Sequence, residues 1–179
     1  MLLTNQQKFL LEAIRRLHCA RIDQLARLLM VPFRLDDQVR AERIVRGAMR
    51  QLQYGDGRVL INGNLVQQPG TMPDRKQLDA VDVMLQLSDA APLDYTLPMP
   101  PVLLRFSIQG TKVQIFSVLD GTANASLACF GPFGPAERLI ILLGKDEIAA
   151  PIPVSNKQFF AKRKEDGSYR FFAPDSQSI

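Results

Sequence analysis

The sequence is poor in the residues that most often carry enzymatic or metal chemistry. It contains one histidine, His18, and two cysteines, Cys19 and Cys129, which lie far apart and have no CxxC partner. Two adjacent ligands do not make a tetrahedral metal site, and a single histidine leaves little choice of general base. We therefore expect no cofactor, no bound zinc or haem and no histidine-dependent catalysis. Both cysteines are expected to pack as small apolar side chains.

Long apolar runs and low-complexity blocks are also missing. No stretch approaches the roughly 18 uninterrupted apolar residues of a membrane span, and residues 1–18 are interrupted by charged side chains. The 179 residues, 46% hydrophobic and 22% charged, suffice for one large or two small globular domains. The sequence thus predicts a cytoplasmic protein that makes no membrane contact.

Positive charge is concentrated in the first part of the chain. Residues 1–70 contain 11 Lys and Arg against 6 Asp and Glu, a balance of +5, whereas residues 71–179 contain 11 against 12, a balance of −1. Ten of the eleven N-terminal cations are arginine, whose planar guanidinium binds phosphate through two parallel hydrogen bonds. This distribution favours an anionic partner for the N-terminal part.

The segment from Gln38 to Gln53 separates its arginines from its aliphatic residues. At 100° per residue the arginines fall within an arc of about 120°, and the aliphatics occupy a similar arc centred on the opposite side. The arginines are Arg40, Arg43, Arg46 and Arg50, and the aliphatics are Ile44, Val45, Ala48, Met49 and Leu52. Ordinary solvated faces mix both signs, but Glu42 is the only acidic residue here. Contact with DNA, docking on an acidic protein and a solvated surface are three uses of such a face.

Periodicity places three helices and a hairpin in the first 72 residues. Helices are predicted from about Asn5 to Leu17, over "IDQLARLLMV", and from Asp36 or Asp37 to near Tyr54, with Thr4 or Asn5 as the first N-cap. "RVLINGNLVQQ" predicts two short strands joined at Asn62-Gly63. This order is typical of a winged helix-turn-helix, whose third helix enters the DNA major groove.

The predicted partner is therefore double-stranded DNA. The protein is expected to bind it either as a monomer or as a homodimer. Arg40 and Arg43 are expected at base edges, and Arg46 and Arg50 at the backbone. Further contacts are expected from Arg34, Arg58, Asn62 and Asn64, the two asparagines lying at the tip of the hairpin.

The second half has the pattern of a small antiparallel or mixed sheet. "VLLRFSIQ" and "KVQIFSVLD" flank Gly110-Thr111, "RLIILLG" is typical of a strand buried on both faces, and the last hairpin turns at Asp166-Gly167. The proline-rich "DAAPLDYTLPMPP" predicts a connector. The fold class is therefore α+β, with a winged helix over residues 1–72 and an α+β domain over 73–179. A helix over 74–88 belongs to either part.

A sheet domain that follows a DNA-binding domain in the sequence raises the possibility of a metal-dependent nuclease. Asp120 closes "IFSVLD", and Asp94 and Glu137 are further carboxylates, but the acidic-x-Lys pair that would complete a magnesium site is missing. We expect no enzymatic activity and a second domain that serves dimerisation or partner recruitment. A vestigial nuclease and an adaptor for an acidic protein partner remain the alternatives.

The chain resembles the replication-relaxation-like proteins of bacterial plasmids and mobile elements. The resemblance rests on "LTNQQKFLLEAIRRLHCARIDQLARLL", "RIVRGAMRQLQ" and "RVLINGNLVQQ", and more weakly on "DAVDVMLQL", "LLRFSI", "VQIFSVLDGT" and "ERLIILL". It implies a winged helix followed by a shortened nuclease-like domain, and a role in the replication of a mobile element or its control. It supplies no catalytic residues.

Overall fold

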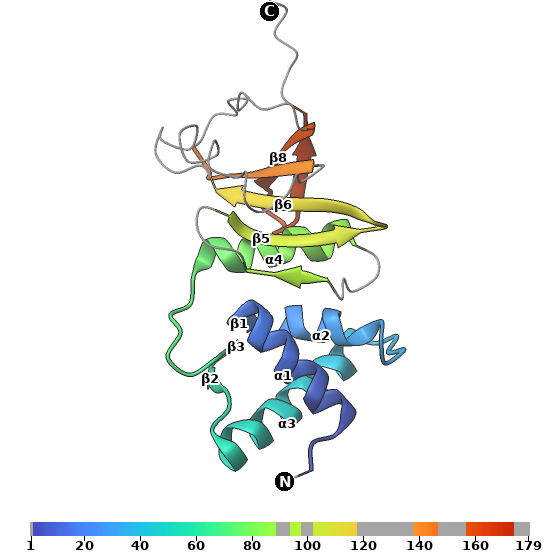
Figure 1. The fold of residues 1–179 in the computed structure, drawn as a ribbon, viewed down its shortest axis with the longest axis vertical. Coiled ribbons are helices and arrows are strands. Elements are labelled where there is room, and N and C mark those ends of the chain that lie inside the picture. The colour runs from blue at the N-terminus through green and yellow to red at the C-terminus, as the bar shows by residue number, and fades with distance from the viewer. Residues whose placement is uncertain (1, 89–93, 98–101, 118–137, 147–156, 174–179) are drawn as a thin grey trace, which may run out of the picture. The chain divides into compact units, whose positions relative to one another are not determined.

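The protein has an α+β fold with four helices and two sheets among the described residues (Figure 1). The computed structural model describes residues 2–88, 94–97, 102–117, 138–146 and 157–173. The chain divides into two compact units, Met1–Leu93 and Asp94–Ile179. Each unit is described by itself below.

The N-terminal unit contains all four helices and a small sheet. Its elements in chain order are α1 (Asn5–Leu17), β1 (Cys19–Arg21), α2 (Ile22–Met30), α3 (Gln38–Asp56), β2 (Leu60–Asn62), β3 (Leu65–Gln67) and α4 (Arg75–Leu87). The three helices and the hairpin expected from the sequence are present in that order. The strand β1 was not expected, because "HCAR" was interpreted as a connection.

Side-chain caps define where the helices begin. The Thr4 hydroxyl accepts a hydrogen bond from the Gln7 amide, and the Gln7 side chain accepts one from the Thr4 amide, so α1 opens with a capping box. Asp37 caps α3 by accepting from the Val39 amide. At the other end of α3, Gly57 adopts φ 62°, a left-handed conformation that glycine takes without steric cost. Of the two candidates that the sequence offered for each helix, Thr4 caps α1 and Asp37 caps α3.

The small sheet has the order β1-β3-β2, with both pairings antiparallel. The hairpin turns at Gly63 and Asn64, one residue later than predicted, and only Gly63 of this pair has a positive φ. That pattern matches a type II′ turn, which suits a two-residue hairpin. Each strand has three residues, so the hairpin is short.

Apolar sides of the helices form the core of the N-terminal unit. In α2, Ile22, Leu25, Leu28 and Leu29 are buried, as their spacing predicted. The helix α4 contacts α2 and β1 and buries Val81, Met84 and Leu85. The structure thus groups this helix, whose place the sequence left open, with the N-terminal unit.

The second unit is built on a six-stranded mixed sheet. Its strands are β4 (Tyr95–Thr96), β5 (Val102–Ile108), β6 (Thr111–Ser117), β7 (Arg138–Leu143), β8 (Lys157–Arg163) and β9 (Tyr169–Phe172). They lie in sequence order; β6, β7 and β8 run parallel, and the other pairs are antiparallel. The strand β4 lies inside the proline-rich segment predicted to be only a connector. That prediction was wrong for Tyr95–Thr96, which pair with Phe106 and Arg105.

The predicted hairpins and the central strand are present in this sheet. The β5–β6 turn consists of Gln109 and Gly110, one residue earlier than the predicted Gly110-Thr111, and both have positive φ, as a type I′ turn requires. Leu139 to Leu143 of β7 are all buried, as predicted for a strand covered on both faces, and β7 lies between β6 and β8 in the sheet. A cluster of Val102, Phe116, Leu139, Ile141, Leu143 and Phe160 forms the core, with Phe172 packed against it.

Candidate nucleic-acid interface

The helix α3 has one buried and one exposed side. Ala41, Val45, Met49 and Leu52 are nearly inaccessible, and Ala48 is 9% exposed. Ile44, expected in the same apolar arc, is only half-buried because it lies at the edge of that arc. The apolar side therefore fixes the orientation of the helix, so the opposite side faces solvent.

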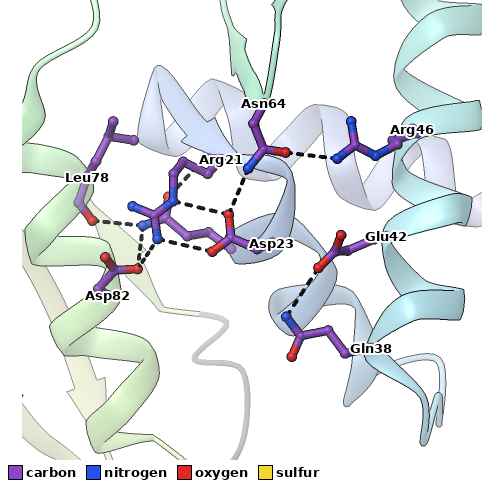
Figure 2. Close-up of polar contacts among 9 residues, drawn as sticks. Arg21, Asp23, Gln38, Glu42, Arg46, Asn64, Leu78 and Asp82 are labelled. Atoms are coloured by element: carbon purple, nitrogen blue, oxygen red, sulfur yellow. Dashed lines mark hydrogen bonds and ion pairs between the residues drawn. The ribbon is translucent and has the colours of Figure 1, made fainter. Parts of the chain in front are cut away.

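All four arginines of α3 lie on the exposed side. These are Arg40, Arg43, Arg46 and Arg50. Glu42, the only acidic residue among them, is half-buried and accepts a hydrogen bond from the Gln38 side chain at 3.3 Å (Figure 2). Within the described part of the N-terminal unit, none of the four guanidinium groups forms an ion pair with a carboxylate. Their positive charge is therefore not neutralised locally.

Arg46 differs from the other three because the hairpin turn holds it. Its Nη2 donates to Oδ1 of Asn64 at 3.0 Å, and Nδ2 of Asn64 donates to Oδ1 of Asp23 at 3.3 Å (Figure 2). The Asn64 carbonyl also accepts from the Ile22 amide at 2.9 Å. The turn is thus docked on the start of α2, and the Arg46 guanidinium lies toward the hairpin.

Asp23 continues this chain of contacts toward α4 through Arg21. The Arg21 guanidinium donates to both oxygens of Asp23, at 3.1 and 3.0 Å, and to Oδ1 of Asp82 on α4 at 2.6 Å (Figure 2). Burial lowers the pKa of Arg21, but its bonds to Asp23 and Asp82 outweigh burial and hold that pKa above its usual value. Buried Gln24 donates to the same Asp82 oxygen at 2.8 Å and to the Leu78 carbonyl. This network fixes β1, α2 and α4 against one another.

The other residues predicted to contact DNA lie around α3, and their side chains differ in exposure and in hydrogen bonding. Arg34 is exposed in the turn before α3, with φ 52°, and Arg58 is exposed just after the helix. Asn62 is exposed at the end of β2, whereas both polar groups of the Asn64 side chain bond within the unit. The structure therefore brings Arg46 and Asn64 into contact and leaves Asn62 facing solvent.

Two further residues of the exposed side were missed from the sequence. Gly47 lies between Arg43 and Arg50 on the helix surface, and Tyr54 lies one turn beyond Arg50 with 83% of its surface exposed. A glycine within a helix costs about 0.5–1 kcal/mol relative to alanine. The same helical wheel that selected the arginines would have found both residues, since each falls within or beside their arc.

Few of the residues considered for other chemistry lie in the described part of the chain. Cys19 is buried, as expected, and burial raises the pKa of its thiol above the usual value. Asp94 accepts a hydrogen bond from the Ser107 hydroxyl at 3.1 Å. Asp120, Cys129 and Glu137 lie outside the described residues. Within the described ranges, no three His, Cys, Asp or Glu side chains gather closely enough to hold a metal ion.

Among the helices of the described part, none combines the length and the apolar character needed to cross a lipid bilayer. Comparison of the chain with family models, with curated proteins and with solved structures yields no match.

Proposed function

We propose that the N-terminal unit is a winged helix-turn-helix that binds double-stranded DNA through the exposed side of α3. The order of its elements and the arrangement β1-β3-β2 of its small sheet support this proposal. In helix-turn-helix proteins the corresponding helix lies in the major groove, where side chains from one side reach base edges and phosphates. The second unit, in this proposal, is non-catalytic and serves dimerisation or partner recruitment.

The observation that carries the proposal is the set of four exposed arginines that the unit itself leaves unneutralised. A solvated helix surface normally pairs opposite charges three or four residues apart, and each pair stabilises the helix slightly. On α3 the arginines repeat at these spacings, and Glu42, four residues before Arg46, accepts from Gln38 and forms no ion pair with an arginine of the described residues, so the cations repel one another. A polyanion would remove this repulsion and would release counterions on binding.

The expected setting is the replication of a mobile element or its control. This part of the proposal rests on the resemblance of "RIVRGAMRQLQ" and the flanking segments to replication-relaxation-like proteins. The resemblance suggests the cellular process in which the proposed DNA binding takes part. This suggestion does not require the second unit to have an enzymatic activity.

Binding of a labelled 20-base-pair duplex, titrated at several salt concentrations, tests the proposal. The variant with Arg40, Arg43, Arg46 and Arg50 all replaced by alanine should lose most of its affinity. The slope of log K against log salt should become shallower by about 0.9 for each phosphate that one of these arginines contacts. A charge-matched control replaces four exposed cations of α1 and α4 by alanine, namely Lys8, Arg15, Arg75 and Lys76.

The control variant should keep nearly the full affinity and salt slope of the parent, because its lost charges lie off α3. An equal loss of affinity in both variants would show that binding depends only on net charge. That result would contradict a specific role for α3. Undiminished binding by the α3 variant would refute the proposal outright. Binding of an acidic protein, with no binding of duplex DNA, would instead support the adaptor hypothesis.

A further inference from the structure

Gly47 lies on the exposed side of α3, where a glycine weakens the helix. It lies well inside Gln38–Asp56, away from both caps. Arg43 precedes it by four residues and Arg50 follows it by three, so the two arginines flank it one turn away on either side. Gly47 itself is exposed.

The fold does not require a glycine at this position. A Cβ built on Gly47 would meet no atom within 4 Å, and the backbone there has no positive φ. Gly57, which ends the same helix, differs because its φ of 62° strains any other residue. Alanine at position 47 would therefore fit and would strengthen the helix. The advantage of a glycine is the close approach of another molecule to the backbone.

We propose that Gly47 is the point at which α3 comes closest to the floor of the DNA major groove, with Arg43 and Arg50 as the pair that reads base edges. This inference rests on the proposed DNA binding. A helix with its side chains is about 10–12 Å across and the groove is about 12 Å wide, so a side chain at an exposed position between the arginines limits how deeply the helix enters. The glycine lets the two flanking arginines reach the bases.

The remaining two arginines lie at opposite edges of the arginine arc, and only Arg46, about 100° from Gly47 around the helix, lies at the angle of a groove wall. Arg40 and Arg46 are separated by about 120° around the helix, with Arg43 and Arg50 between them. The Arg46 guanidinium is hydrogen-bonded to the Asn64 side chain, on the side of the helix that faces the hairpin. We therefore assign Arg46 to a phosphate. This agrees with the order along the helix for Arg46 but differs from it for Arg50, which that order placed at the backbone.

Two substitutions in the full chain test the role of Gly47, with thermal unfolding and affinity measured on the same samples. Gly47→Ala should raise the melting temperature by roughly 4 °C, since alanine favours the helix. It should also weaken binding of a duplex selected from a random 20-base-pair library by about tenfold, because the arginines lose their reach. Gly47→Gln, with a longer side chain of good helix propensity, should bind more weakly still while remaining folded.

The outcomes separate this inference from the proposed function. If the parent binds DNA in a manner that depends on the arginines, and both Gly47 variants bind as tightly as the parent, the inference fails and the proposed function stands. If the parent does not bind duplex DNA, both fail. A gain in thermal stability coupled to a loss of affinity that grows with side-chain size supports the inference.

Discussion

At the scale of single residues, Arg21 and Asn64 connect parts of the N-terminal unit that are far apart in sequence. Arg21 bridges Asp23 and Asp82, and Asn64 bridges Arg46 and Asp23. A partly buried guanidinium is tolerated here because two carboxylates accept its hydrogen bonds. None of these long-range partners follows from sequence spacing, since Arg21 and Asp82 are separated by 61 positions.

Replacing Asp82 by alanine should destabilise the N-terminal unit by about 1–3 kcal/mol. The change removes the partner of Arg21 at 2.6 Å and one acceptor of the buried Gln24 amide. The measurement is the shift of the urea unfolding midpoint, followed by helical circular dichroism.

Glu12→Ala is the matched control for Asp82→Ala, because it also removes one carboxylate from an arginine pair. The Glu12–Arg16 pair lies on the surface of α1, with side chains 52% and 39% exposed. Such exposed pairs contribute about 0.3–0.5 kcal/mol. Equal shifts in the two variants would show that the network adds no more than a surface pair.

At the scale of elements, the helices followed from the sequence more completely than the strands. The bounds of α1 and its Thr4 cap, and the Asp37 cap of α3, depend on hydrogen bonds between residues two or three apart. The strands β1 and β4 were missed because they have three and two residues, too few for an alternating pattern. They are strands only because their backbones pair with those of β3 and β5.

The helix α4 offers an element-scale prediction. A fragment of residues 1–93 should unfold cooperatively, whereas a fragment of residues 1–72 should be less stable by at least about 3 kcal/mol. The shorter fragment loses α4, and with it the burial of Val81, Met84 and Leu85 and the Asp82 contact. Thermal unfolding of both fragments is the measurement. Equal stability would show that α4 contributes nothing to the N-terminal unit.

At the scale of the whole molecule, the chain consists of two compact units. The sequence anticipated two parts from the change of pattern and the proline-rich segment, and it anticipated the basic balance of residues 1–70. The proposed DNA contacts all lie in the first unit. The second unit supplies a mixed sheet whose edge strands, β4 and β9, are short, which limits pairing with other sheets.

The two units should therefore differ in DNA binding when they are produced separately. Residues 1–93 should bind a single-site duplex with the same salt slope as the full chain, since the slope counts the phosphates contacted. Residues 94–179 should show no measurable binding under the same conditions. Fluorescence anisotropy across salt concentrations is the measurement. A slope that is recovered only in the full chain would assign phosphate contacts to the second unit.

The sequence alone determined the helices, the principal hairpins and the two-sided character of α3, and it narrowed the N-caps of α1 and α3 to two neighbouring residues each, because each feature depends on residues close together in the chain. Only the tertiary structure decided the pairing of β1 with β3, the place of α4, and the docking of Asn64 between Arg46 and Asp23. Those contacts join residues that no periodicity relates. It also distinguished Gly47 from Gly57 by backbone conformation, since Gly57 has a φ of 62° whereas Gly47 has no positive φ.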